Sequence, residues 1–111
     1  MGYRSDVAIV MDKEKYAEAL LTNELPTFLG KDLQPQITEV GVFWYIEETK
    51  WYSGYRFIDD TMNFLEPLFV EGLAGFIRAG EDHGDIEVKG NPEKYDMHVN
   101  IDIDMPPGFE W

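Results

Sequence analysis

Two stretches of the chain are apolar on both faces of an extended strand, a pattern typical of strands in the interior of a sheet. The first stretch covers residues 6–11 and is rich in β-branched side chains. The second covers residues 37–47, where one face would carry Val40, Val42, Trp44 and Ile46 and the other face Phe43 and Tyr45. We therefore expect residues 6–11 to form a central strand. The second strand should be either central or covered by a partner.

Apolar residues at helical spacing predict two helices. After Asp12, which can cap a helix N-terminus, apolar side chains recur at positions 16, 17, 20 and 21, and Asn23 and Pro26 end the pattern. A second helix is expected from about Phe57, with apolar residues at positions 58, 62, 65 and 69 and a glycine cap at position 72. Pro67 lies inside this second pattern, so a kink or a break is expected there.

The last third of the chain predicts a meander of strands. Short strands are expected at residues 76–77 and 86–89, with a polar turn at residues 80–85 between them. From residue 95 to residue 105, apolar and polar residues alternate without interruption, which predicts one long strand with a dry and a wet face. Residues 106–111 form a short tail rich in proline, glycine and aromatic residues.

Taken together, these elements predict a single α+β domain over residues 1–111 with the order β-α-β-α-β-β-β. We expect a four- to five-stranded, mostly antiparallel sheet with two helices packed on one face, related to the ferredoxin-like arrangement. A hydrophobic fraction of 44% in 111 residues is enough for one core.

The charge changes the picture of possible partners. There are 22 acidic residues against 9 Lys and Arg, a formal net charge of −13. A surface of this sign repels nucleic acids and anionic membranes, so we expect neither as a direct partner. Its expected partner is a protein with a basic surface, including a surface that binds nucleic acid. Alternatively, the charge only maintains solubility.

Three segments carry candidate binding residues. The first is the turn at residues 80–85, where Glu81, Asp82, His83 and Asp85 are grouped, and such oxygen and imidazole ligands can hold a hard cation. The spacing of a calcium loop of the EF-hand type is absent, and these residue types are also common in solvated turns. A solvated turn is therefore the favoured interpretation, and we predict no metal site.

The second segment is the wet face of the predicted last strand. His98, Asp102 and Asp104 would point the same way, at a separation of about 6.7 Å between successive residues of one face. That spacing is too wide for successive residues to share one ion. The face is either simply solvated or a flat array of carboxylates that meets a basic surface.

The third segment is aromatic. Residues 43–45 and Trp51, Tyr52 and Tyr55 are close in sequence, and most of them should pack in the core. Trp51 and Tyr52 lie in a turn and are expected to be partly exposed, where such side chains often anchor a partner. The predicted partner-binding set combines these aromatic residues with acidic ones: Trp51, Tyr52, Tyr55, Glu81, Asp82, Asp85, Glu87, Asp96, Asp102 and Asp104.

Catalytic motifs are not recognisable in the sequence. There is no Gly-rich phosphate loop, no GxSxG and no HExxH pattern, and without cysteine the chain has no disulfide, thiolate metal site or thiol nucleophile. We predict a protein that is not an enzyme and needs no cofactor. No apolar run is long enough to span a membrane and no secretory signal is visible, so a cytoplasmic location is expected.

The opening MGYRSDV, the KWYxxY motif at residues 50–55 and the FIRxGEDxxDI motif at residues 76–86 resemble a loose group of small proteins encoded by bacteriophages and prophages. The resemblance implies a phage protein that binds and inhibits a host protein. By analogy, the expected inhibitor would act like the anti-restriction and anti-CRISPR proteins that mimic the charge of DNA. Its target would be a defence component that handles nucleic acid.

Two alternative functions stay open. One is an accessory protein that assembles with itself. Its homodimer would bury the second strand or the aromatic tail residues Phe109 and Trp111. The other is a small metal-dependent or acid–base enzyme that uses the acids of residues 80–85 together with His98.

Overall fold

The computed structural model describes residues 3–52, 54–82, 84–99 and 103–110. It contains a five-stranded antiparallel sheet with the order β2-β3-β1-β4-β5, and a separate hairpin, β6-β7. The predicted α+β class is confirmed. The strands are β1 (Ser5–Met11), β2 (Gln36–Ile37), β3 (Val42–Thr49), β4 (Ala74–Gly80), β5 (Ile86–Gly90), β6 (His98–Val99) and β7 (Ile103–Asp104). The helices are α1 (Lys13–Leu21) and α2 (Arg56–Glu71), with a π-helical turn η1 (Phe28–Asp32) and a 3₁₀ turn η2 (Pro92–Tyr95).

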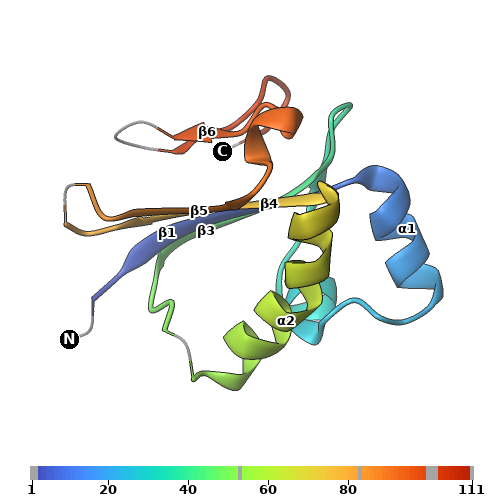
Figure 1. The fold of residues 1–111 in the computed structure, drawn as a ribbon, viewed down its shortest axis with the longest axis horizontal. Helices are drawn as coiled ribbons and strands as arrows, with labels where there is room; N and C mark the ends of the chain where they lie inside the picture. Colours follow the sequence, from blue (N-terminus) through green and yellow to red (C-terminus); the bar gives the residue numbers. More distant parts are fainter. Residues whose placement is uncertain (1–2, 53, 83, 100–102, 111) are drawn as a thin grey trace.

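Strand β1 is the central strand, as its sequence predicts. It pairs with β3 on one side and with β4 on the other, so that Ile9 lies opposite both Trp44 and Phe76. Its residues from Val7 to Met11 have no solvent exposure. Side chains that alternate between two buried faces require a cover on each side of the sheet. Figure 1 shows these covers: α1 and α2 lie on one face, and the segment that contains β6 lies on the other.

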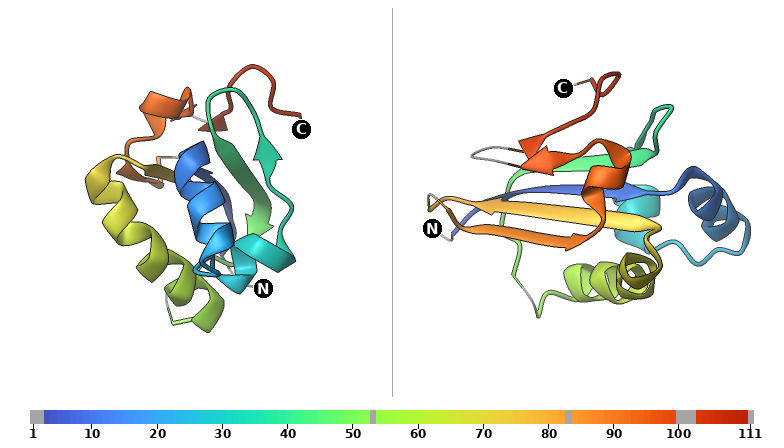
Figure 2. Two further views of the ribbon diagram at one scale, coloured as in Figure 1. Left: turned by 90° about the vertical axis from the view of Figure 1, so that its right-hand side faces the viewer. Right: turned by 45° about the horizontal axis from the view of Figure 1, so that its top comes forward.

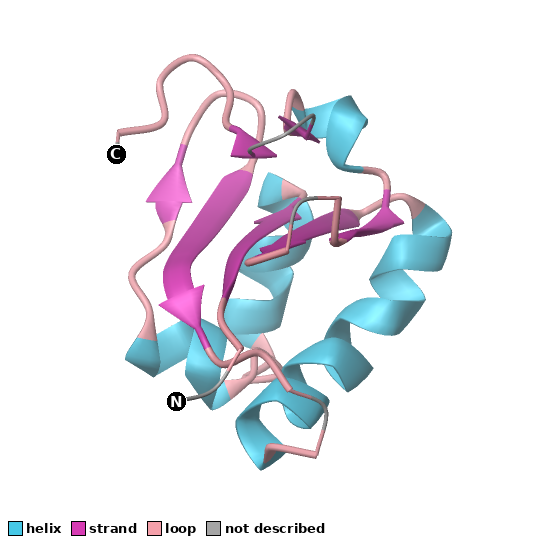
Figure 3. Cartoon of the chain, turned by 90° about the vertical axis from the view of Figure 1, so that its left-hand side faces the viewer, coloured by secondary structure: helices cyan, strands magenta, loops and turns pink. Residues whose placement is uncertain are grey.

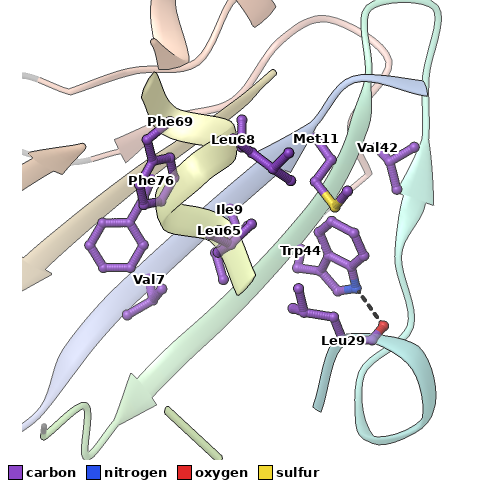
Figure 4. Close-up of a cluster of buried hydrophobic side chains, with 11 residues drawn as sticks. Val7, Ile9, Met11, Leu29, Val42, Trp44, Leu65, Leu68, Phe69 and Phe76 are labelled. Atoms are coloured by element: carbon purple, nitrogen blue, oxygen red, sulfur yellow. Dashed lines mark hydrogen bonds between the residues drawn. The ribbon is translucent and has the colours of Figure 1, made fainter. Parts of the chain in front are cut away.

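The helix-covered face holds the larger hydrophobic cluster (Figure 4). The indole N–H of Trp44 donates a hydrogen bond to the carbonyl oxygen of Leu29 at 3.0 Å, so the buried polar atom of this side chain is satisfied. The ring of Tyr16 on α1 meets the Trp44 ring edge-on at a centroid distance of 5.7 Å. The buried members of this cluster are Val7, Ile9, Met11, Leu29, Val42, Trp44, Leu65, Leu68, Phe69, Ala74 and Phe76.

The C-terminal segment covers the opposite face, and the predicted long strand from residue 95 to residue 105 is wrong. The chain forms η2, then places Asp96 in the left-handed region at φ 63°, and continues into the short β6-β7 hairpin. Gly90, at φ 71°, and Pro92 turn the chain off the sheet edge, because proline has no N–H for a strand ladder. Figure 2 shows the hairpin stacked over the sheet.

The predicted alternation of buried and exposed side chains is nevertheless present in the C-terminal segment. Tyr95, Met97 and Ile103 are buried against the sheet, whereas His98 and Asp104 are exposed. The apolar side chains join a second cluster, consisting of Ala8, Val10, Phe43, Ile77, Tyr95, Met97 and Ile103. The pattern therefore identified the dry side correctly, but the dry side packs on a sheet face and does not extend the sheet.

Strand β3 is consequently covered on both faces by its own chain. The ring of Phe109 lies 6.2 Å from that of Phe43 and 6.3 Å from that of Tyr45, both edge-on. The Gln36 side chain of β2 also exchanges hydrogen bonds with the backbone N–H and carbonyl of Glu110. Phe109 and the faces of β3 are thus packed within one molecule, whereas Ile37 and Val40 of the expected second strand stay 65% and 41% exposed. Trp111 lies outside the described residues.

Three predicted element boundaries differ from the structure. The expected strand over residues 37–47 is two strands, because Thr38 N–H donates to the Gly41 carbonyl at 2.9 Å and closes a turn between β2 and β3. The short strand at residues 76–77 is part of the longer β4. Helix α2 continues through Pro67 without a break; this residue is exposed, so water can reach the carbonyl left without a partner.

Both predicted helix caps are confirmed, but of the predicted apolar positions of α1 only Tyr16 packs against the core, whereas Ala17, Leu20 and Leu21 are exposed. Asp12 accepts a hydrogen bond from the Lys15 N–H at 3.1 Å, and Gly72 ends α2 at φ 76°. On α1, however, Ala19 is buried while Leu21 is 88% exposed. The small side chain of Ala19 lets α1 lie close to the core. Leu20 and Leu21, at the end of the helix, lie beyond the part that packs against the core.

The C-terminal cover makes a prediction about stability. We expect Met97→Ala to lower the free energy of unfolding by about 2–5 kcal/mol, the usual cost of a cavity at a fully buried methionine. Val70→Ala is the control, because Val70 is 87% exposed and its truncation should change stability by no more than about 0.5 kcal/mol. Urea unfolding of both variants measures the difference. Equal stability of the two would contradict the assignment of residues 92–110 as part of the core.

Candidate partner-binding surface

The sheet ends of β4 and β5 and the loop before α2 form a groove, here called the Arg78 groove, of about 610 Å³. It lies on the helix-covered face, beside the first turns of α2. Four residues of the predicted partner-binding set line it: Trp51, Tyr52, Asp85 and Glu87. The fold thus brings together aromatic and acidic residues that are more than 30 positions apart in the sequence.

Arg78 organises this groove from strand β4. Its side chain is only 17% exposed, and its guanidinium contacts both oxygens of Asp85, at 3.0 and 3.3 Å. Its Nε donates to Glu87 at 3.1 Å, and one terminal nitrogen donates to the buried hydroxyl of Ser5 at 3.0 Å. The planar fork of arginine suits this bidentate pairing, which a lysine could not reproduce.

The same contacts shift the ionisation of both partners. The hydrogen bonds from Arg78, and next the one from Tyr3, hold the pKa of Asp85 below its ordinary value. The hydrogen bonds that Arg78 and the Tyr3 hydroxyl donate to Asp85 likewise raise the pKa of Arg78 and of Tyr3. Arg78 therefore offsets one of the two negative charges of Asp85 and Glu87 within the molecule. Their main contribution is to the shape of the groove.

Tyr3 ties the start of the chain to the turn between β4 and β5. Its hydroxyl donates to Asp85 at 2.6 Å and accepts the backbone N–H of Asp82 at 2.8 Å. The hydroxyl of Tyr52 donates to the Tyr3 carbonyl at 2.7 Å, which fixes the loop before α2 to the same point. These bonds hold one wall of the groove against the other.

The sequence analysis did not identify Arg78 and Tyr3 as residues of this groove. A turn at residues 80–85 places Arg78 opposite Glu87 on a hairpin, and this cross-strand pair is seen in the structure. That signal was available, because opposite charges on facing strands attract. The role of Tyr3 had no comparable signal, since its partner is 82 residues away in the chain.

Residues 51–52, from the loop before α2, line the Arg78 groove, and residues 54–57, which lead into α2, line a second hollow, here called the Phe57 groove, of about 700 Å³. Trp51 is half-buried, with its ring 6.1 Å from Phe28 and 5.9 Å from Phe76, so it belongs to both the core and a groove wall. Tyr55 lines the second groove together with Phe57, and they are 44% and 40% exposed. The expectation of partly exposed aromatic residues in this loop is met.

Other predicted residues lie outside the two grooves. Glu81 and Asp82 are exposed in the turn after β4, and Glu81 shares a small hollow with Asp6 and Glu48 at the end of the sheet. Asp96 and Asp104 are exposed in the C-terminal segment, on the opposite side of the sheet. Figure 3 shows this separation of the helices from the C-terminal segment. Asp102 lies outside the described residues.

The proposed cation ligands are not assembled by the part of the chain that the structure describes. Asp85 turns towards Arg78 and Tyr3, His98 belongs to the opposite face of the sheet, and His83 is outside the described residues. Within the described ranges, no group of three or more His, Asp or Glu side chains is arranged to hold a metal ion.

Comparison with known proteins yields no relative. No protein-family model matches the chain, and no curated protein or solved structure shows significant similarity to it. Among the described residues, no helix has the length and apolar character needed to cross a membrane. The properties of the grooves therefore provide the evidence for function.

The Asp85–Arg78 pair predicts a specific dependence of stability on pH. The folded state lowers the pKa of Asp85, so its contribution to stability is present above the ordinary aspartate pKa of about 3.9 and is lost as the pH falls through the lowered value. Asp85→Asn should lower the melting temperature at pH 7, and the deficit relative to the unchanged protein should shrink towards pH 2.

The control is Asp104→Asn, a change of the same charge at an exposed position of the hairpin. Its melting temperature should follow that of the unchanged protein at both ends of the pH range. A deficit of Asp85→Asn that stays constant from pH 7 to pH 2 would show that the carboxylate does not stabilise the fold through its charge.

Proposed function

We propose that this protein binds a partner protein through a basic surface on that partner and thereby inhibits it. The observation that carries the proposal is an exposed aromatic loop flanked by carboxylates in a chain of net charge −13. The partner is a host protein that handles nucleic acid, such as a defence component, and the protein is a phage inhibitor. The resemblance of three sequence segments to phage proteins supports this part of the proposal.

The binding surface runs from the Phe57 groove across residues 54–57 and 51–52 to the Arg78 groove and the turn after β4. Exposed aromatic side chains supply a large contact area at a small cost in side-chain entropy, which suits them as anchors. Asp60, Glu81 and Asp82 lie along this path and are exposed. Carboxylates in these positions accelerate the encounter with a positive surface and fix its register.

The two kinds of acidic residue have different tasks in this proposal. Asp85 and Glu87 are paired with Arg78 and keep the groove in shape. Glu81 and Asp82, in the turn after β4, are exposed and face an approaching partner, and the Glu81 carboxylate also accepts the Arg4 backbone N–H at 3.0 Å. Asp96 and Asp104 lie on the other side of the sheet and add only to the long-range field.

The test is capture of a purified, nucleic-acid-binding host protein at low and high salt. The Debye length shrinks from about 10 Å at 0.1 M salt to about 3 Å at 1 M, so binding that depends on charge should weaken strongly. Glu81→Gln/Asp82→Asn should weaken capture about tenfold at low salt, because two carboxylates of the binding surface lose their charge.

The matched control is Glu39→Gln/Glu71→Gln, which removes the same two charges at exposed positions away from the grooves. Only the first double variant should lose affinity. If both variants bind equally well and salt has no effect, the acidic turn does not contact the partner and charge mimicry is refuted.

A further inference from the structure

The Phe57 groove has a wall of aromatic rings. Tyr55 and Phe57 are stacked with an interplanar angle of 18° at 6.0 Å between centroids, and Phe28 approaches Phe57 at 4.8 Å. Tyr55 and Phe57 stay more than a third exposed although each has aromatic neighbours to pack against. Aromatic rings left partly open to solvent in a groove of about 700 Å³ provide a surface that a ligand can contact.

The rest of the lining determines which ligand suits these rings. Asp32, at the end of η1, and Asp60, on the first turns of α2, contribute carboxylates. Arg56 is the basic residue of the lining. Its side chain is 95% exposed, and its Nε lies 3.8 Å from the Asp60 carboxylate, a long distance for an ion pair. An exposed ion pair of this length adds little binding energy, so the Asp60 carboxylate stays available to another cation.

We propose that the Phe57 groove binds one arginine side chain of the partner protein. This inference rests on the proposed function and adds the chemistry of its anchor. The faces of aromatic rings attract cations, and carboxylates pair with them. A guanidinium is flat, so it can stack on an aromatic ring and pair with a carboxylate through two parallel hydrogen bonds. The compact ammonium group of lysine can form neither of these two contacts.

The net charge of the chain favours this occupant over an apolar one. An apolar side chain would use the rings but would leave Asp32 and Asp60 at the edge of a dehydrated contact, which is costly for charged groups. An arginine uses the rings and the carboxylates at once. Basic surfaces that bind nucleic acid are rich in arginine, which agrees with the partner class.

The experiment is a titration of the protein with the blocked peptide acetyl-Gly-Arg-Gly-amide, followed by NMR. Two further probes are the same peptide with lysine and with citrulline, which keeps the shape of arginine without its charge. We expect shifts concentrated at the Gly54 amide and at the Tyr55 and Phe57 rings. Affinity should fall about threefold for the lysine peptide and further for the citrulline peptide.

Variants locate the site. Asp60→Asn should weaken arginine binding about threefold, whereas Glu71→Gln, the same change of charge at the other end of α2, should leave it unchanged. Tyr55→Leu keeps an apolar side chain but loses the aromatic face, and should weaken binding by a similar factor. Arg56→Gln should strengthen it, because a competing cation is removed.

Shifts spread over the whole acidic surface, or equal losses for Asp60→Asn and Glu71→Gln, would overturn the arginine site. Stronger binding of the citrulline peptide than of the arginine peptide would overturn it as well, since the groove would then be an apolar site. The titration needs no host protein. Its failure leaves the salt-dependent capture, and therefore the proposed function, to be judged separately.

Discussion

The burial of β1 on both of its faces is the constraint on which the rest of the structure depends. Its residues from Val7 to Met11 lose all contact with water, alternately towards the helices and towards the C-terminal segment. A two-stranded or one-sided sheet cannot bury such a strand, so neighbours are needed on both edges and covers on both faces. Residues 92–99 and 103–110 therefore serve as the second cover.

That second cover has a consequence for the functional surface. Residues 92–99 and 103–110 pack over one side of the sheet, whereas the Arg78 and Phe57 grooves lie on the helix side, where the loop before α2 and the ends of β4 and β5 leave room. The acidic residues of the C-terminal segment, such as Asp104, are carried to the far side. The described acidic residues of the last third of the sequence are thus divided in space between two faces.

A highly acidic chain must also manage repulsion between its own carboxylates. Arg78, largely shielded from solvent, lies between Asp85 and Glu87 and satisfies two charges where the ends of the strands converge. A half-buried ion pair with several hydrogen bonds fixes geometry more than it adds stability. This local neutralisation keeps a groove open beside Trp51 while the charge at the tip of the turn stays exposed.

The sequence by itself determined the features that depend on interactions between residues close together in the chain. The apolar pattern of residues 6–11 made β1 central, and the alternation after residue 95 separated a dry from a wet side. The Asp12 side chain capped the start of α1, and the left-handed backbone of Gly72 ended α2. Each of these results depends on neighbours within a few residues along the chain.

Only the tertiary structure decided where these pieces lie relative to each other. The alternation of residues 95–105 suits a strand at the edge of a sheet and a hairpin stacked on its face equally well, and the uncovered face of β1 and β3 selected the second. The site was decided in the same way. Tyr3, Tyr52 and Asp85 are far apart in sequence, and their hydrogen bonds exist only once the sheet has brought the strand ends together.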